Sequence, residues 1–207
     1  MHKHNDGAFV IGIPIYPNVD LIDVAGAFDI FSRIPSPWQG REYKTVVVAE
    51  DKKPVMTGQG LELTPHATFD DCGQLTLIWT PGATEPKVSD AYKKFLLEQA
   101  KGAEWVTSVC TGALILSEVG LLDGYEATTH WLALDTLRKN TKVKVASGYP
   151  RYVIDRNRVT GGGVTSTLDE ALAVVALVTR LDVAHTIQET VQYRFPTEFT
   201  MAGVGNL

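Results

Sequence analysis

The stretch from Glu104 to Gly120 constrains the fold of this chain more than any other part of the sequence. It begins as a short apolar run that favours a β-strand and continues as a helical pattern that ends at Gly120, a residue type common just after a helix. Cys110 lies where the period changes, and the small residues Ser108 and Gly112 allow the two backbones to approach each other. A sharp strand-to-helix turn of this kind lifts a nucleophile above the edge of a sheet.

Two interpretations of Cys110 follow from this stretch. A thiol at the start of a helix lies near unpaired N–H groups and the positive end of the helix dipole, which favour the thiolate and a catalytic role. A buried structural cysteine fits the stretch equally well, because free cysteine is among the residue types most often buried. The rest of the chain has to decide between them.

Strand-like and helical segments alternate along the chain, which predicts an α/β fold with a mostly parallel sheet. In such a fold, ligands bind near the carboxyl ends of the strands. The predicted strands are 10–13, 43–49, 75–79, the run before Cys110, and 127–130. The predicted helices are 21–31, 88–100, the segment after Cys110, the segment after Trp131, 166–180 and 182–195, with hairpins over 55–63 and 152–160.

Four residues with chemical potential each follow a separate strand-like run: Asp23, Gly82, Cys110 and His130. Asp23 lies among apolar neighbours, so we expect a buried carboxyl that keeps its proton to higher pH. The turn at Gly82 can aim backbone N–H groups into a crevice, although an ordinary turn explains it equally well. A lone histidine at position 130 is more often structural than catalytic. The convergence of the four favours the catalytic interpretation of Cys110.

Size and composition limit the partners of the chain. A length of 207 residues predicts a single domain over 1–207, with a flexible leader (1–7) and a flexible tail (about 197–207). A net charge of −5 with no basic block argues against nucleic acid, and no apolar run reaches membrane-spanning length. Two cysteines make no disulfide framework and we see no signal peptide, so we expect a cytoplasmic protein. The triple glycine 161–163 fits no phosphate-binding motif, so we interpret it as close backbone packing.

Several segments, in this order, resemble the ThiJ/PfpI superfamily. They are 16–17 with 21–26, 69–72, 81–84, 106–112, 127–131, and 160–165 with Asp169. The resemblance implies a flavodoxin-like three-layer sandwich, with helices on both faces of the sheet and a cysteine at a nucleophile elbow. It also implies a homodimer, for which the apolar Phe28 and Phe31 of the first helix could supply contacts. Thr111, where protease-like relatives carry histidine, points to the hydratase branch of the superfamily.

Carried over to this sequence, the resemblance implies roles for five residues. Cys110 would be the nucleophile, Asp23 its acidic neighbour, and Thr111 a hydrogen-bond donor beside the sulfur. Backbone N–H groups at Gly82 or Ala83, together with that of Cys110, would form an oxyanion-type pocket. Ala83 replaces a glycine of the relatives and narrows this pocket. We expect a Cys110 thiolate at neutral pH with a proton held by Asp23, and oxidation of Cys110 before Cys72 by mild peroxide.

The activity implied is the addition of water to a small isocyanide, which gives an N-formamide through a cysteine thioimidate and needs no metal or organic cofactor. Two alternatives stay open. One is a glyoxalase or deglycase-like enzyme acting on small aldehydes, with His130 as proton shuttle. The other is a non-enzymatic redox or ligand sensor that uses the same cysteine.

Overall fold

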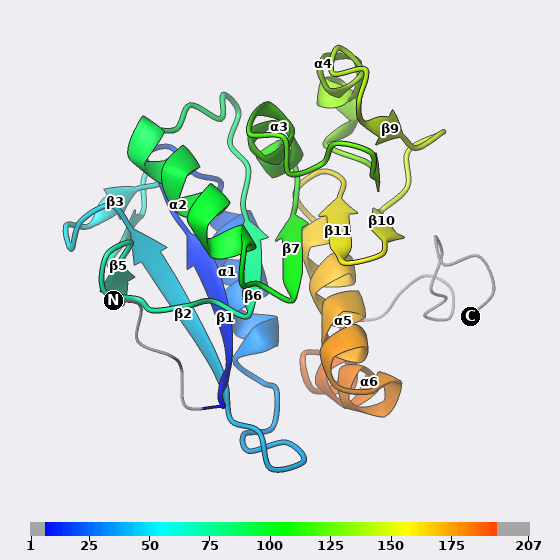
Figure 1. The fold of residues 1–207 in the computed structure, drawn as a ribbon. Helices are drawn as coiled ribbons and strands as arrows, with labels where there is room; N and C mark the ends of the chain where they lie inside the picture. The colour runs from blue at the N-terminus through cyan, green and yellow to red at the C-terminus, as the bar shows by residue number, and fades with distance from the viewer. Residues whose placement is uncertain (1–6, 194–207) are drawn as a thin grey trace.

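The computed structural model describes residues 7–193, and a seven-stranded sheet forms its centre (Figure 1). The strand order is β10-β11-β7-β6-β1-β2-β5, and every neighbouring pair is parallel except β10 and β11. The strands are β1 (Phe9–Pro14), β2 (Tyr43–Ala49), β5 (Ala67–Thr68), β6 (Leu77–Thr80), β7 (Trp105–Ser108), β10 (Tyr152–Asp155) and β11 (Arg158–Gly161).

Helices cover both faces of this sheet, as the sequence predicts. Helices α1 (Leu21–Phe31) and α5 (Ser166–Val178) pack against each other on one face, and α6 (Leu181–Thr190) packs on α5. Helices α2 (Asp90–Ala100) and α3 (Gly112–Glu118) cover the opposite face, where α2 lies in front of the sheet in Figure 1. The predicted three-layer α/β architecture is therefore confirmed.

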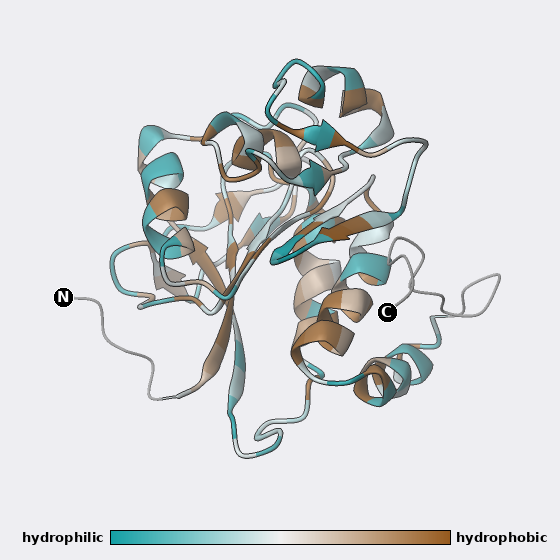
Figure 2. Cartoon of the chain, turned by 45° about the vertical axis from the view of Figure 1, so that its right-hand side comes forward, coloured by the Kyte–Doolittle hydropathy of each residue, from teal (hydrophilic) through white to brown (hydrophobic). Residues whose placement is uncertain are grey.

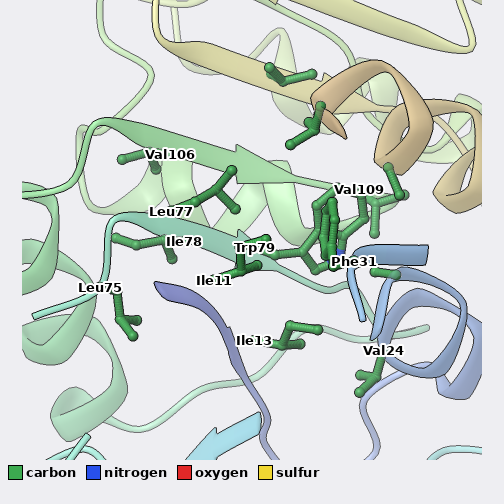
Figure 3. Close-up of a cluster of buried hydrophobic side chains, with 14 of the residues drawn as sticks. Ile11, Ile13, Val24, Phe31, Leu75, Leu77, Ile78, Trp79, Val106 and Val109 are labelled. Carbon is green, nitrogen blue, oxygen red and sulfur yellow. The ribbon is translucent and has the colours of Figure 1, made fainter. Parts of the chain in front are cut away.

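The core extends over both faces of the sheet, and one part of it lies between the sheet and α1. Strands β1 and β6 are buried along their whole length, as expected for parallel strands covered on both faces. Figure 3 shows side chains of β1, β6 and β7 gathered with Val24 and Phe31 of α1. Trp79 meets Phe31 edge-on, with ring centroids 5.2 Å apart, and its indole Nε1 donates to the Asp23 carbonyl oxygen at 2.9 Å. The core therefore fixes the backbone of α1 at Asp23.

Hydropathy follows the same layers. Figure 2 shows hydrophobic residues concentrated in the central strands and in α5, whereas α2 carries both hydrophilic and hydrophobic turns. Of the two aromatic residues that we expected to supply a dimer contact, Phe31 is buried in the core and offers no surface, whereas Phe28 stacks on His66 and is half-buried. Within residues 7–193, no helix combines the length and apolar character needed to cross a membrane.

The region before His130 differs from the prediction. The expected strand 127–130 is only β8 (Glu126–Ala127), which pairs with β9 (Lys144–Val145) in a separate two-stranded sheet. The next two threonines leave the strand because they bond elsewhere: Thr128 N–H donates to Thr160 Oγ1, and Thr129 Oγ1 donates to the Cys110 carbonyl. His130 therefore precedes a 3-10 helix, η1 (Trp131–Ala133), and the short α4 (Leu134–Leu137), rather than ending a strand of the main sheet.

Other predicted elements are present with small shifts at their ends. The predicted hairpin over 55–63 is the antiparallel pair β3 (Val55–Met56) and β4 (Glu62–Leu63), and β10 and β11 form the second hairpin. The two C-terminal helices end at Val178 and Thr190, earlier than expected. Apart from Gly7, the predicted flexible leader and tail lie outside the described residues.

Candidate active site

Cys110 occupies the turn between β7 and α3, and its backbone is left-handed, with a φ of 56°. This conformation is unfavourable for a residue with a side chain, so its surroundings must hold it. Cys110 N–H donates to the Gly162 carbonyl at 2.8 Å, and Gly112 N–H donates to the Val109 carbonyl at 3.0 Å. Only glycine fits at position 112, because a Cβ there would lie 2.1 Å from the Thr80 carbonyl oxygen. The predicted strand-to-helix turn is therefore present, and Cys110 in this turn is 5% exposed.

Asp23, in the first turn of α1, is fully buried beside Cys110. Its Oδ2 accepts the Gly82 N–H at 2.9 Å, its Oδ1 accepts the Thr167 hydroxyl at 3.3 Å, and the Cys110 side chain also hydrogen-bonds to this carboxyl. Burial, followed by the nearby charge of Asp20, raises the pKa of Asp23 from 3.8 to about 7, although the three hydrogen bonds oppose this change. The expected buried carboxyl that keeps its proton to higher pH is present.

The expected thiolate at Cys110 is wrong for the free protein. Burial, followed by the charge of Asp23, raises the pKa of Cys110 to about 12. Backbone N–H groups of Thr111 and Val164 bond to the sulfur and oppose this change, but desolvation outweighs them. At neutral pH the sulfur therefore keeps its proton, and the adjacent Asp23 carboxyl is near its midpoint and can exchange one.

Thr111 contributes to the site through its main chain. Its hydroxyl donates to the Ala83 carbonyl at 2.6 Å and accepts the Ala83 N–H at 2.9 Å. Thr111 was expected as a hydrogen-bond donor beside the sulfur, and the donor is its backbone N–H, because the hydroxyl proton is used on Ala83. The side chain therefore ties the turn after β6 to the start of α3.

The three N–H groups expected to form an oxyanion-type pocket are already hydrogen-bonded within the chain. Gly82 N–H donates to Asp23, Ala83 N–H to Thr111, and Cys110 N–H to Gly162. Gly82 is required for close packing, because a Cβ would lie 2.6 Å from the Thr111 nitrogen and 2.9 Å from the Cys110 Cβ. The N–H groups that converge on the sulfur are those of Thr111 and Val164.

His130 is connected to Cys110 through its backbone. Its N–H donates to the Cys110 carbonyl at 3.4 Å, while its ring Nδ1 accepts the Leu132 N–H at 3.3 Å and caps η1. The ring lies against Gly163, where a Cβ would be 2.3 Å from the histidine Cδ2. The triple glycine thus permits close packing, as predicted, and the imidazole has a structural task.

Two cavities are lined by residues close in the chain to the site, although neither Cys110 nor Asp23 lines them. The larger has a volume of about 900 Å³ and includes Tyr16, whose hydroxyl donates to the Pro81 carbonyl at 3.2 Å. The smaller has a volume of about 430 Å³ and includes His130 and Val164. Within residues 7–193, no three His, Cys, Asp or Glu side chains are grouped to hold a metal ion.

Four residues of the site were not assigned to it from the sequence. Thr167 and Val164 come from the segment that starts α5, and only the packing of α5 on α1 brings them to Asp23 and Cys110. Asp20 caps α1, and its charge acts on Asp23. Glu170 is fully buried one turn beyond Thr167, and neither carboxyl oxygen has a hydrogen-bond partner among the described residues. Burial and the charge of Asp23 raise the pKa of Glu170 well above its ordinary value. The apolar residues around Glu170 in α5 were the sequence signal that could have indicated its burial.

Comparison with known proteins places this geometry in a family. Residues 11–177 match the model of the DJ-1/PfpI family. The isonitrile hydratase of Pseudomonas putida is 36% identical over 90% of this chain and 79% of its own length. The HTH-type transcriptional regulator GbdR of Pseudomonas aeruginosa is 31% identical over 80% of this chain, which spans only 45% of that regulator.

Among solved structures, a ThiJ/PfpI family protein from Pseudomonas syringae superposes with a TM-score of 0.81 and 31% identity, covering 96% of this chain and 84% of that one. The sheet order, the turn at Cys110 and these similarities agree with one another. The chain belongs to the DJ-1/PfpI family.

Proposed function

We propose that this chain is an isonitrile hydratase-like enzyme, which adds water to a small isocyanide and releases an N-formamide. The observation that carries the proposal is a buried thiol hydrogen-bonded to a carboxyl whose pKa is near 7. Such a carboxyl suits proton transfer in both directions at neutral pH. The similarity to the isonitrile hydratase of Pseudomonas putida supports the same reaction class.

The first half of the reaction adds the thiol across the isocyanide carbon. Asp23, as a carboxylate, takes the Cys110 proton while the sulfur attacks the terminal carbon, and the N–H groups of Thr111 and Val164 stabilise the negative charge on sulfur. Asp23 then gives the same proton to that carbon. The S–H bond breaks, S–C and C–H bonds form, and the product is a thioimidate on Cys110.

The second half releases the product. Water attacks the thioimidate carbon, its oxygen bonds to that carbon, and one proton passes to the substrate nitrogen. The C–S bond then breaks, the carbon becomes the carbonyl of a formamide, and the hydroxyl proton returns to the sulfur through Asp23. The net change is one water added to one isocyanide, and Cys110 and Asp23 end as they began.

The burial of Cys110 supports a slim substrate group. Because Cys110 is only 5% exposed, a substrate must reach its sulfur with a narrow group. An isocyanide group is linear and ends in its reactive carbon, whereas an aldehyde bears its reactive carbon inside a wider trigonal group. A deglycase-like reaction would also need His130 as proton shuttle, and its ring is engaged with Leu132 and Gly163.

A sensor function is the second candidate, and the sequence similarity to GbdR is the observation that favours it. A redox sensor is supported less, because it needs a low-pKa thiol and burial raises the pKa of Cys110. From the family resemblance we also propose a homodimer, and from the cysteine content a cytoplasmic location. A monomer mass by light scattering at micromolar concentration would contradict the dimer.

Turnover of a panel of small isocyanides in H₂¹⁸O tests the function. We expect formamide that carries one ¹⁸O atom, formed by the wild type and not by Cys110→Ala. A ligand-sensing protein would bind members of the panel without forming formamide. That outcome would exclude the hydratase proposal.

A further inference from the structure

The β3–β4 hairpin is docked on the segment that leads into α1. Asn18 N–H donates to the Met56 carbonyl at 2.8 Å, and Gly58 N–H donates to the Val19 carbonyl at 3.0 Å. Thr57 is buried at 2% exposure between these two bonds. The turn of the hairpin is therefore held beside the start of the helix that carries Asp23.

Gln59, at this turn, uses both ends of its side-chain amide on the start of α1. Its Oε1 accepts the Leu21 N–H at 2.8 Å, and its Nε2 donates to Asp20 Oδ2 at 2.9 Å. The other carboxylate oxygen of Asp20 accepts the N–H groups of Ile22 at 3.0 Å and Asp23 at 3.4 Å. Asp20 is thereby fixed in one orientation by a residue some forty positions away in the chain.

The hydrogen bonds continue from Asp20 to the site. Asp20 N–H donates to the Gly82 carbonyl at 2.8 Å, and Gly82 N–H donates to Asp23 Oδ2 at 2.9 Å. Gly82 in turn packs directly against Cys110 and Thr111. A continuous set of contacts therefore connects the exposed Gln59 to the thiol and its proton partner.

We propose that Gln59 and Asp20 form a positioning pair for the Cys110–Asp23 site, in which Gln59 holds the Asp20 carboxylate in one orientation at the start of the helix that carries Asp23. The catalytic role of this pair rests on the proposed function, whereas the effect of the Asp20 charge on Cys110 and Asp23 does not. An N-cap alone would be satisfied by Asp20 without Gln59. The helix N–H groups hold only Asp20 Oδ1, and the Gln59 amide fixes Oδ2 as well.

The titratable groups that interact electrostatically with Asp23 come from four parts of the chain. They are Asp20 before α1, Tyr16 after β1, Cys110 at the elbow and Glu170 on α5. Burial raises the pKa of Tyr16 and of Glu170 well above their ordinary values, which favours their neutral forms. Asp20 therefore supplies the neighbouring negative charge, and it raises the pKa of Asp23 and of Cys110.

The test measures the alkylation of both cysteines by iodoacetamide at pH 8 and low ionic strength, with peptide mass spectrometry to separate them. Asp20→Asn keeps a good N-cap and removes the charge. We expect Cys110 to react about threefold faster or more, which corresponds to about half a pH unit in its pKa. Cys72 serves as an internal control, because Asp20 is not among the groups that shift its pKa.

Gln59→Ala and the double variant Asp20→Asn/Gln59→Ala show whether Gln59 acts through Asp20. We expect Gln59→Ala alone to accelerate Cys110 alkylation by less than Asp20→Asn, and to add nothing in the Asp20→Asn background. Leu61→Ala, an exposed change in the same hairpin, is the matched control and should leave the rate unchanged.

An unchanged Cys110 alkylation rate in Asp20→Asn would overturn the proposal and leave Asp20 as a helix cap. Equal effects of Gln59→Ala on the alkylation rate in both backgrounds would show that Gln59 does not act through Asp20. Alkylation does not require isocyanide turnover, so absence of formamide would refute the proposed function and leave this result standing. If both hold, the pH profile of turnover in Asp20→Asn should move to lower pH by a similar amount.

Discussion

The two cysteines of this chain share a raised pKa but differ in what faces the sulfur. Burial raises the pKa of Cys72 to about 11 and that of Cys110 to about 12. Cys72, in the turn after β5, donates its S–H to the Gly73 carbonyl at 3.4 Å, which keeps the proton on the sulfur. Cys110 faces the Asp23 carboxyl, which can take the proton, and two backbone N–H groups.

The comparison separates resting acidity from reactivity. Neither thiol is a thiolate at neutral pH, so thiolate content alone would rank the two cysteines as equally inert. N–H groups reach both sulfurs, but of the two cysteines only Cys110 is hydrogen-bonded to a carboxyl that can accept its proton. The proposed chemistry therefore depends on proton transfer during the attack, and not on a thiolate formed beforehand.

Removal of each sulfur gives the largest expected contrast. We predict that Cys110→Ala folds normally and that its hydratase rate falls by at least about 10³-fold, because the covalent route is lost. Cys72→Ala should keep the wild-type rate within about threefold. Formamide assays with circular dichroism of both variants measure this. Comparable rates for Cys110→Ala and wild type would end the nucleophile hypothesis.

Replacement of Asp23 by asparagine tests the proton acceptor that Cys72 lacks. We predict that the hydratase rate of Asp23→Asn falls by about 10²- to 10⁴-fold, since an amide cannot carry the proton. Near-normal turnover would show that Asp23 is only a structural carboxyl.

The same variant should change stability with a defined sign. The folded-state pKa of Asp23 is raised from 3.8 to about 7, so the wild type loses stability as pH rises through this window. The interval of about three pH units corresponds to about 4 kcal/mol of unfolding free energy. Asp23→Asn has no such titration, so urea denaturation should show its stability improving relative to wild type from pH 4 to pH 7. A constant difference across this range would contradict a raised pKa.

Thr111 offers a smaller contrast near the reactive sulfur. Thr111→Val loses both hydrogen bonds to Ala83, which should lower the free energy of unfolding by about 1–3 kcal/mol and the rate by about tenfold. Thr111→Ser keeps the hydroxyl and should restore most of both. A rate loss as large as that of Asp23→Asn would instead indicate that the hydroxyl donates directly to the sulfur.

Local features of the site were readable from the sequence. The strand-to-helix period change and the small residue Gly112 placed the turn at Cys110, because backbone geometry there depends on neighbours in the chain. Apolar neighbours around Asp23 indicated its burial for the same reason. The α/β layering followed from the alternation of strand and helix patterns.

Features set by tertiary contacts were not readable. The N–H of Gly82 was expected to face a substrate, but the approach of α1 gives it to Asp23. The thiolate was expected from a local helix terminus, whereas burial by the whole fold raises the pKa of Cys110. His130 was expected at the end of strand 127–130, but the bonds of Thr128 to Thr160 and of Thr129 to Cys110 end the strand early.

The most direct test of the account is the mass of the covalent intermediate. Because the thiol adds across the isocyanide carbon without a leaving group, acid quench during turnover should give protein heavier by the full mass of the isocyanide. Peptide mapping should place this mass on Cys110, with Cys72 unmodified and with no adduct in Cys110→Ala. Turnover without any adduct on Cys110 in wild-type protein, or an adduct on Cys72 that tracks activity, would contradict the account.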